Sequence, residues 1–246
     1  MNEQKISRER FGGCFNRSEY NAIDIEKFNS PKNVRAYLKN LDMKTIKKYS
    51  INTSLGFGVL TLSVVGNLNV GTIMRTAQLM GASRYVVFGK RQFDTRSAVG
   101  AMHYMNVERV YGLKDNKTEL KKNLTALERM ICPDKFYNYM IANNLVPVFL
   151  EQRHDAVYDD NVNWNTRERK LKKGWKFCFV FGNEGDGIAD DVVTKGLTIP
   201  NSFVICIRQL GALQSFNVSA SVAIILSQYK NYKMKKRLGR YGLITD

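Results

Sequence analysis

The junction between a buried strand and a helix has the sequence Gly66-Asn-Leu-Asn-Val-Gly-Thr-Ile-Met-Arg-Thr-Ala77. Asn69 is a good N-cap residue, so we expect a helix over residues 70–80, which Gly81 can end. The apolar side chains of this helix recur at helical spacing and share one face: Val70, Ile73, Ala77 and Met80. Arg75 lies on the opposite face, at the carboxyl edge of the preceding strand, where open α/β sheets bind ligands. The alternative interpretation of Arg75 is an ordinary solvated helix residue.

Short β-rich runs alternate with helical patterns on both sides of this junction. We expect strands at residues 57–65, 84–88, 107–111, 145–150, 177–181 and 203–207. We expect helices at residues 70–80, 119–130, 135–143 and 217–236. Such alternation predicts an α/β domain with a mostly parallel sheet and helices on both faces.

The composition and the apolar pattern of the sequence divide the chain into three parts. Residues 1–54 form a polar, basic N-terminal extension with a weak helical stretch at 33–48, and they suggest an arm that contacts RNA. Residues 55–229 form the α/β domain, and residues 230–246 form a basic C-terminal tail.

Composition narrows the class of protein further. The 246 residues contain no apolar run of the roughly 18–20 residues that a membrane span requires. The N-terminal residues MNEQKISRER lack the apolar core of a secretory signal. We therefore expect a soluble intracellular protein with no membrane partner, placed in the cytoplasm, with nucleus and organelle left open.

The chain is strongly basic, with 38 Lys and Arg against 22 Asp and Glu and a net charge of +16. One cluster contains six cations and no acid, namely Lys230, Lys233, Lys235, Lys236, Arg237 and Arg240. Tyrosines at 229, 232 and 241 lie between these cations and could stack on unpaired bases. A second basic cluster spans residues 167–176 and has only Glu168 opposing it. Such clusters are typical of proteins that bind nucleic acids. The alternative is a generally basic composition without a partner.

The cysteine and histidine content disfavours a metal site and a catalytic relay of the Ser-His-Asp or Cys-His type. The four cysteines lie far apart, at positions 14, 132, 178 and 206, and form no C-x-x-C pair. The chain has two histidines, His103 and His154, and no spacing typical of metal ligands. We expect no metal.

Two further segments follow predicted strands. Phe181-Gly-Asn-Glu-Gly-Asp-Gly-Ile188 is a glycine-rich turn whose backbone can approach a ligand closely, with Glu184 in its middle. It matches neither the dinucleotide nor the P-loop fingerprint. Ile207-Arg-Gln-Leu-Gly-Ala-Leu-Gln-Ser-Phe-Asn-Val-Ser219 leads into the last predicted helix, and Ser215 and Asn217 are cap-type residues there. That helix is apolar nearly all round, so a partner subunit is a natural cover for it.

Taken in order, the three segments resemble the motifs of the SpoU/TrmH-like branch of the SPOUT RNA 2′-O-ribose methyltransferase family. The first motif matches at Asn69, Gly71, Ile73, Arg75, Thr76 and Ala77. The second matches at Gly182, Glu184, Gly185 and Gly187. The third matches at Ile207, Gly211, Ser215, Asn217, Val218 and Ser219. The resemblance covers roughly residues 55–229.

This resemblance implies a homodimeric enzyme that transfers a methyl group from S-adenosylmethionine to a ribose 2′-hydroxyl of structured RNA, either tRNA or rRNA. It also implies a deep C-terminal trefoil knot and composite active sites. The residues implied to bind the cofactor are Gly182, Ile207 and Phe216. The implied catalytic residue is Arg75, supported by Asn69, Glu184, Ser215 and Asn217.

The chain departs from the family pattern at two places. Arg208-Gln209 stands where the family has Pro-Met, and Phe216 stands where it has Leu. Because the proline shapes the loop around the cofactor, cofactor affinity is the property put in doubt. The rival hypotheses are a SPOUT-fold RNA-binding or assembly protein that has lost methyl transfer, and a base methyltransferase of a related branch.

Overall fold

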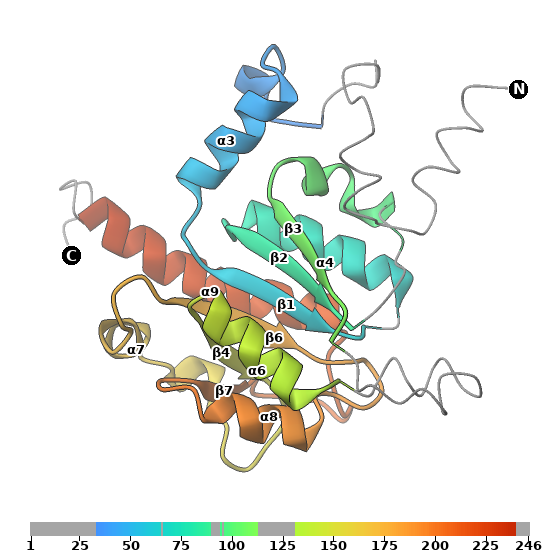
Figure 1. Cartoon of the computed structure of the whole chain (residues 1–246), viewed down its shortest axis with the longest axis vertical. Coiled ribbons are helices and arrows are strands. Elements are labelled where there is room, and N and C mark those ends of the chain that lie inside the picture. The colour runs from blue at the N-terminus through green and yellow to red at the C-terminus, as the bar shows by residue number, and fades with distance from the viewer. Residues whose placement is uncertain (1–32, 65, 90–93, 95, 113–130, 240–246) are drawn as a thin grey trace, which may run out of the picture.

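The structure is a computed structural model that describes residues 33–64, 66–89, 94, 96–112 and 131–239. A central sheet lies between two layers of helices, and a short helical segment stands at one end of the sheet (Figure 1). The α/β class expected from the sequence is confirmed.

The sheet has seven strands in the order β3-β2-β1-β6-β4-β7-β5, and every pairing is parallel. The strands are β1 (Gly58–Leu62), β2 (Arg84–Phe88), β3 (Asn106–Val110), β4 (Leu145–Leu150), β5 (Val157–Tyr158), β6 (Lys176–Phe181) and β7 (Phe203–Cys206). All five residues of β1 are buried, and so are five of the six residues of β4 and of β6. Strands covered on both faces are typical of parallel sheets, and these three form the centre of the core.

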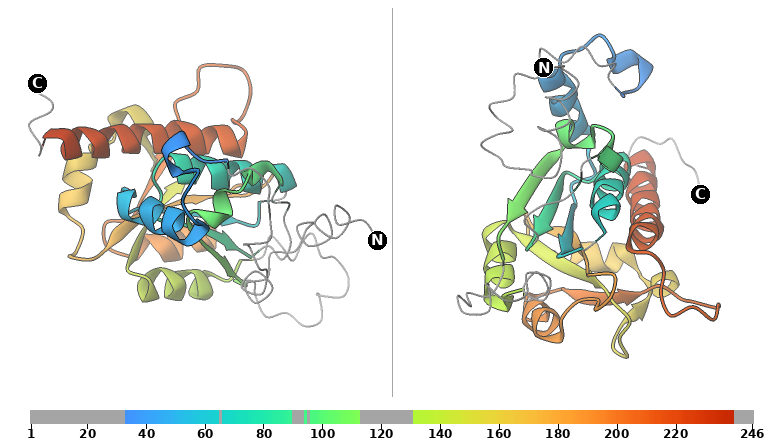
Figure 2. Two further views of the ribbon diagram at one scale, coloured as in Figure 1. Left: turned by 90° about the horizontal axis from the view of Figure 1, so that it is seen from above. Right: turned by 90° about the vertical axis from the view of Figure 1, so that its right-hand side faces the viewer.

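Helices cover both faces of the sheet, as the sequence predicts (Figure 2). One layer contains α4 (Asn67–Leu79) and α9 (Val218–Gly239), and the other contains α6 (Pro133–Ala142) and α8 (Asp190–Leu197). The helix α7 (Trp164–Arg169) lies against α9. Short 3-10 turns connect other elements: η2 (Ala36–Leu38), η3 (Arg96–Ala98), η4 (Ala101–His103) and η5 (Asp159–Asn161).

The predicted face of α4 is confirmed. Val70, Ile73 and Ala77 are buried, whereas Arg75 is exposed. Gly81 follows the helix with a φ of +87°, the left-handed conformation typical of a helix end. The predicted N-cap is wrong, because Gly66 occupies that position and Asn69 lies inside the first turn.

The N-terminal helical stretch expected at 33–48 is displaced toward the C-terminus. The helix α3 (Met43–Thr53) begins after Asp42, whose carboxylate accepts a hydrogen bond from the Thr45 amide at 2.9 Å. This cap starts the helix at Met43 and leaves only η2 ahead of it. The elements β5, α7 and α8 were not predicted, and the helix expected at 119–130 lies outside the described residues.

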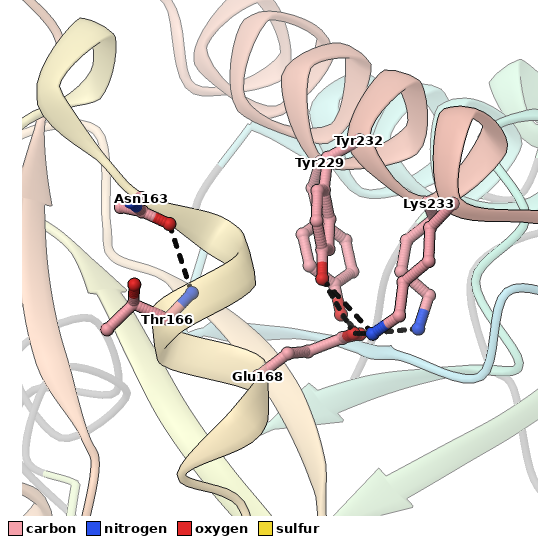
Figure 3. A network of polar contacts seen from close by, with 7 residues as sticks. Asn163, Thr166, Glu168, Tyr229, Tyr232 and Lys233 are labelled. Carbon is pink, nitrogen blue, oxygen red and sulfur yellow. Dashed lines mark hydrogen bonds and ion pairs between the residues drawn. The ribbon is translucent and has the colours of Figure 1, made fainter. Parts of the chain in front are cut away.

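The long helix α9 is anchored to α7 by a single carboxylate (Figure 3). Glu168 accepts hydrogen bonds from the hydroxyls of Tyr229 and Tyr232 and from the ammonium groups of Lys233 and Lys236. Burial by itself raises the pKa of Glu168, but the bonds from Lys233, Lys236 and Tyr229 outweigh it and lower the pKa to about 2. The carboxylate is therefore held ionised between the two helices.

This anchor changes the interpretation of the C-terminal cations. Tyr229 is buried at 2% exposure, where its ring lies 4.9 Å from that of Trp164, so it cannot stack on an RNA base. Two lysines of the cluster are paired with Glu168. The helix α9 corresponds to the closing helix expected at 217–236 and continues to Gly239, so the first ten residues of the basic tail are helical.

None of the helices in the described ranges has the length and apolar character needed to cross a lipid bilayer. Cys132, Cys178 and Cys206 are free thiols. The same ranges contain no group of three or more His, Cys, Asp or Glu side chains suited to hold a metal ion.

Candidate active site

A pocket of about 340 Å³ opens at the carboxyl ends of β4, β6 and β7. Parallel α/β sheets bind ligands beyond this edge, and small-molecule sites have volumes of roughly 300–1,000 Å³. The lining comes from the end of β4 (150–152), the glycine-rich turn (181–187), residues 206, 207 and 209, and residues 214–216, 218 and 221. Five of the residues proposed from the sequence line this pocket: Gly182, Glu184, Ile207, Ser215 and Phe216.

The glycine-rich turn after β6 is held in shape by Asn183. Its carboxamide oxygen accepts from the Gly185 amide at 2.8 Å, and its amide group donates to the Ser63 carbonyl at 2.9 Å. The backbone of Asn183 also pairs with that of Gly187 across the turn. A Cβ at Gly182 would overlap the Gly187 carbonyl, so the chain passes here only without a side chain. Gly182 is thus required because the turn packs against its own backbone, and the approach of this backbone to a ligand stays a prediction.

The three sequence motifs meet at the carboxylate of Glu184. One of its oxygens accepts from the Asn69 side chain at 2.7 Å and from the Gly66 amide at 3.0 Å. The Asn217 side-chain amide lies 3.4 Å from the Asn69 oxygen and extends the chain of contacts. Asn69 thus connects the start of α4 to the other two motifs, which explains why it does not serve as the helix cap.

The segment 207–217 closes one side of the pocket and ends at α9. The Gln152 side chain donates to the Gln214 carbonyl at 2.7 Å and ties this segment to the end of β4. Asn217 caps α9, because its side-chain oxygen accepts from the Ser219 amide at 2.8 Å. Asn217 therefore serves both as a cap and as a contact of Asn69.

Arg208, which stands where the family has proline, contacts residues of the neighbouring segment 158–160. Its backbone amide donates to Asp159 at 3.0 Å, and its guanidinium forms an ion pair with Asp160 at 3.0 Å. The same guanidinium stacks over the ring of Tyr158, 4.0 Å from the centroid. The hydrogen bond from Arg208 lowers the pKa of Asp160. These contacts attach the start of the 207–217 segment to η5, at the place where the family uses a proline.

The pocket is acidic although the chain is basic. Glu151, Glu184 and Asp186 line it, and no lysine or arginine is found among its described lining residues. Glu151 is fixed by the backbone, since it accepts from the Ile188 amide at 2.7 Å and from the Gln152 amide at 3.0 Å. The pocket therefore favours a cationic ligand.

Arg75 is not brought to this pocket within one chain. It lines a separate cavity of about 660 Å³ between α3, α4 and α9. Within the described part of the chain its side chain has no hydrogen-bond or ion-pair partner. The sequence placed Arg75 correctly on the outer face of α4, but its expected position at the carboxyl edge of the sheet is wrong. Residues 53–55 and 78–81 line the same cavity and precede β1 and β2, so the cavity lies toward the amino ends of these strands. A single chain therefore does not unite Arg75 with Glu184.

Several contributors to the site were not singled out from the sequence. Asn183 lies inside the quoted glycine-rich turn, yet nothing local shows that its side chain reaches the Ser63 carbonyl. Gln152 and Asp160 belong to segments without any motif. For both, the partner is 48 to 62 residues away in the chain, so no local pattern could have indicated them.

The molecule is thus a parallel α/β protein with a pocket beyond the carboxyl ends of its strands. The sequence profile of the SpoU rRNA Methylase family matches residues 57–227. The chain belongs to this family. A search of curated proteins finds no match.

Solved structures of similar fold agree with this assignment. The TrmH/SpoU tRNA modifying enzyme from A. aeolicus has a TM-score of 0.56 and 18% identity, over 80% of this chain and 84% of that one. The SpoU methyltransferase AviRb from Streptomyces viridochromogenes, in complex with AdoMet, has a TM-score of 0.52 and 17% identity, over 74% and 59%. The AdoMet-bound rRNA methyltransferase from Sinorhizobium meliloti has a TM-score of 0.52 and 18% identity, over 74% and 60%.

Two of these matches cover only part of the matched structure. The chain spans 59% of the length of AviRb and 60% of that of the Sinorhizobium meliloti enzyme. At 17% and 18% identity, the likeness to all three structures establishes the fold alone, which is that of the SPOUT methyltransferases.

Proposed function

We propose that this protein is an S-adenosylmethionine-dependent methyltransferase that acts on a ribose 2′-hydroxyl of structured RNA, either tRNA or rRNA. The observation that carries the proposal is the acid-lined pocket formed by the family motifs in a chain of net charge +16. A cationic cofactor and a polyanionic substrate thus have separate, complementary surfaces.

The residues of the pocket fit S-adenosylmethionine, whose sulfonium and ammonium groups are positively charged. Glu151, Glu184 and Asp186 supply negative charge, and the backbone of the glycine-rich turn lines the pocket at Gly182, where its polar groups can bind a ligand. Ile207 and Phe216 supply apolar surface for the adenine and its ribose. We assign Gly182, Ile207 and Phe216 to cofactor binding.

S-adenosylmethionine would supply an electrophilic methyl group and leave as S-adenosylhomocysteine. The chain must orient the accepting hydroxyl, whose proton passes to the adjoining phosphate or to solvent as the new O–C bond forms. A guanidinium stays protonated in proteins. Arg75 therefore acts as a cation that holds the ribose hydroxyl and its neighbouring phosphate and stabilises the negative charge that develops on O2′. Asn69, Glu184, Ser215 and Asn217 position the reacting groups around it.

A homodimer with composite active sites completes this assignment, since Arg75 lies outside the acidic pocket of its own chain. Exposed leucines beside the pocket are consistent with a partner surface. In the 207–217 segment, Leu210 is 95% exposed and Leu213 is 84% exposed. In this arrangement, Arg75 of one copy reaches the pocket of the other. The deep trefoil knot of the C-terminal third is part of the same proposal.

The direct test is incubation of total RNA with methyl-labelled S-adenosylmethionine, followed by alkaline hydrolysis. Methylation of a 2′-hydroxyl blocks cleavage at the next phosphate, so we expect label in alkali-resistant dinucleotides. Label in ordinary mononucleotides after nuclease digestion would instead identify a base methyltransferase.

Calorimetry with S-adenosylmethionine separates the enzyme from a binding protein that has lost methyl transfer. We expect saturable 1:1 binding per chain. RNA binding without any measurable cofactor binding would contradict the proposed activity.

A further inference from the structure

The cavity that contains Arg75 is built largely from parts of the chain outside the family match. The family match covers residues 57–227. The cavity is lined by residues of η2, α3, the last turns of α4 and the second half of α9, and also by residues 98, 99, 101 and 104. At about 660 Å³ it is larger than the acidic pocket.

The charge of this cavity is opposite to that of the acidic pocket. Arg35, Arg75, Lys230 and Arg237 line it, and no aspartate or glutamate is found among its described lining residues. Cations gathered around a hollow without acids favour a polyanion such as a phosphodiester chain.

The distribution of cations around α9 shows which of them face the cavity, where the Arg237 guanidinium also donates to the Thr53 carbonyl at 3.3 Å. At about 100° per residue, Lys230 and Arg237 lie on one face of the helix. Lys233 and Lys236 lie on a neighbouring face and are paired with Glu168 (Figure 3). Lys233 and Lys236 are thus held by Glu168, whereas Lys230 and Arg237 are the α9 cations that line the cavity.

Aromatic side chains line the N-terminal side of the same cavity. Tyr37 is 57% exposed and Tyr49 is 40% exposed, and their rings pack edge to face with centroids 6.1 Å apart. Their hydroxyls lie 3.1 Å from each other, and the Arg35 guanidinium lies 3.5 Å from the Tyr37 hydroxyl. Exposed tyrosine rings beside cations are the platforms on which unpaired bases stack.

We propose that this cavity binds a single-stranded segment of the RNA substrate and leads it to Arg75. Arg35, Lys230 and Arg237 contact the phosphates, and Tyr37 stacks on a base. The inference rests on the proposed function, because it places the RNA beside the arginine that the methyl transfer requires. It adds a role for residues 33–54 and for the second half of α9, which the family match does not cover.

The test compares two double variants of equal charge by fluorescence anisotropy with a labelled single-stranded RNA of about ten nucleotides. In the first, Lys230→Gln and Arg237→Gln, both cations leave the cavity. In the second, Lys235→Gln and Arg169→Gln, two exposed cations outside the cavity are lost. We expect the first variant to bind at least about tenfold more weakly, and the slope of log affinity against log salt to fall by about 0.7 per lost phosphate contact. The second variant should retain both the affinity and the slope.

A second pair of variants separates the contribution of base stacking to RNA affinity from that of charge. Tyr37→Ala should weaken binding of the same RNA by about fivefold or more, whereas Tyr37→Phe should keep wild-type affinity because the ring remains. Tyr37 is largely exposed, so neither change should affect folding, which thermal unfolding of both variants can verify.

Three outcomes would overturn the inference. Equal losses in the two double variants would show diffuse attraction by the whole surface. Unchanged affinity in all cavity variants, with a wild type that methylates RNA, would overturn the cavity and leave the proposed function intact. Sedimentation that changes from dimer to monomer in the cavity variants would show that a second copy covers this face. Cavity-dependent RNA binding by a wild type that transfers no methyl group would overturn the proposed function alone.

Discussion

The Asn69 side-chain amide donates to the Glu184 carboxylate across 2.7 Å, although the two residues are 115 positions apart in the chain. The same oxygen accepts from the Gly66 amide. This contact joins the first turn of α4 to the glycine-rich turn after β6. It therefore couples the element that carries Arg75 to the pocket proposed for the cofactor.

Glu184→Gln tests whether the charge at this contact matters beyond its geometry. Glutamine keeps an acceptor for Gly66 and Asn69 but removes the negative charge. Hydrogen bonds to charged groups contribute about 1.5–3 kcal/mol, so we expect methyl transfer to fall about tenfold or more, with weaker cofactor binding by calorimetry. Asp186→Asn, which removes another carboxylate of the pocket, is the matched control. Equal losses of methyl transfer in both variants would indicate that only the total negative charge of the pocket matters, and not the Glu184 contact.

Arg75→Ala should abolish turnover while cofactor and RNA affinities stay within a few-fold of wild type. Loss of one group that stabilises developing negative charge costs about 100-fold or more in rate. Single-turnover methylation with saturating RNA and cofactor measures this effect. Near-normal turnover would refute the assigned role.

Mixing the two impaired variants tests the composite site. In dimers formed from Arg75→Ala and Glu184→Gln chains, one of the two sites contains both native residues. Random exchange of subunits should therefore restore about a quarter of wild-type activity. Mixtures that remain as inactive as the separate variants would show that each site uses residues of one chain.

Arg208→Pro introduces the family residue and removes both contacts of Arg208 with η5. Because the Arg208–Asp160 pair is half exposed, its contribution is modest, about 0.2–1 kcal/mol. We expect Asp160→Asn to raise KM for S-adenosylmethionine about two- to fivefold with little change in kcat, and Arg208→Pro to raise it more. A KM lowered by Arg208→Pro would show that the ion pair does not substitute for the proline.

Gly182→Ala should eliminate cofactor binding, because its Cβ would overlap the Gly187 carbonyl and displace the turn. Gly185→Ala, three residues further along, is the control, since its Cβ would lie 3.4 Å from the nearest atom. Calorimetric titration with S-adenosylmethionine and thermal unfolding of both variants measure the difference. Equal cofactor affinity in the two variants would contradict the crowded turn.

Glu168→Gln should change how stability depends on pH. The folded pKa of Glu168 is about 2, below the roughly 4.3 of an unfolded glutamate. Its contribution is therefore fully present above about pH 4.3 and is lost as the pH falls toward 2. Calorimetric Tm values should differ between wild type and variant at pH 7 and converge below pH 3. Asp134→Asn, which breaks an exposed pair with Lys195, should shift Tm little at any pH.

The local pattern of residues accounts for most of the observed elements. Alternating apolar runs predicted six of the seven strands, and helical spacing placed Arg75 on the outer face of α4. The element missed in the sheet, β5, has two residues, which is too short for any periodicity. The helices α7 and α8 span six and eight residues, and such short helices carry a weak periodic signal.

The sequence by itself determined the fold class, the three motifs and the basic character of the chain, since each depends on residue types at short spacing. Only the tertiary structure decided which polar and charged side chains are buried, which are paired, and which lie apart. It buried Tyr229, paired Lys233 and Lys236 with Glu168, linked Arg208 to Asp160, and separated Arg75 from Glu184. The physical reason is that helical and strand periodicity are local, whereas a side chain's partner depends on which distant segment the folded backbone brings within about 3–4 Å.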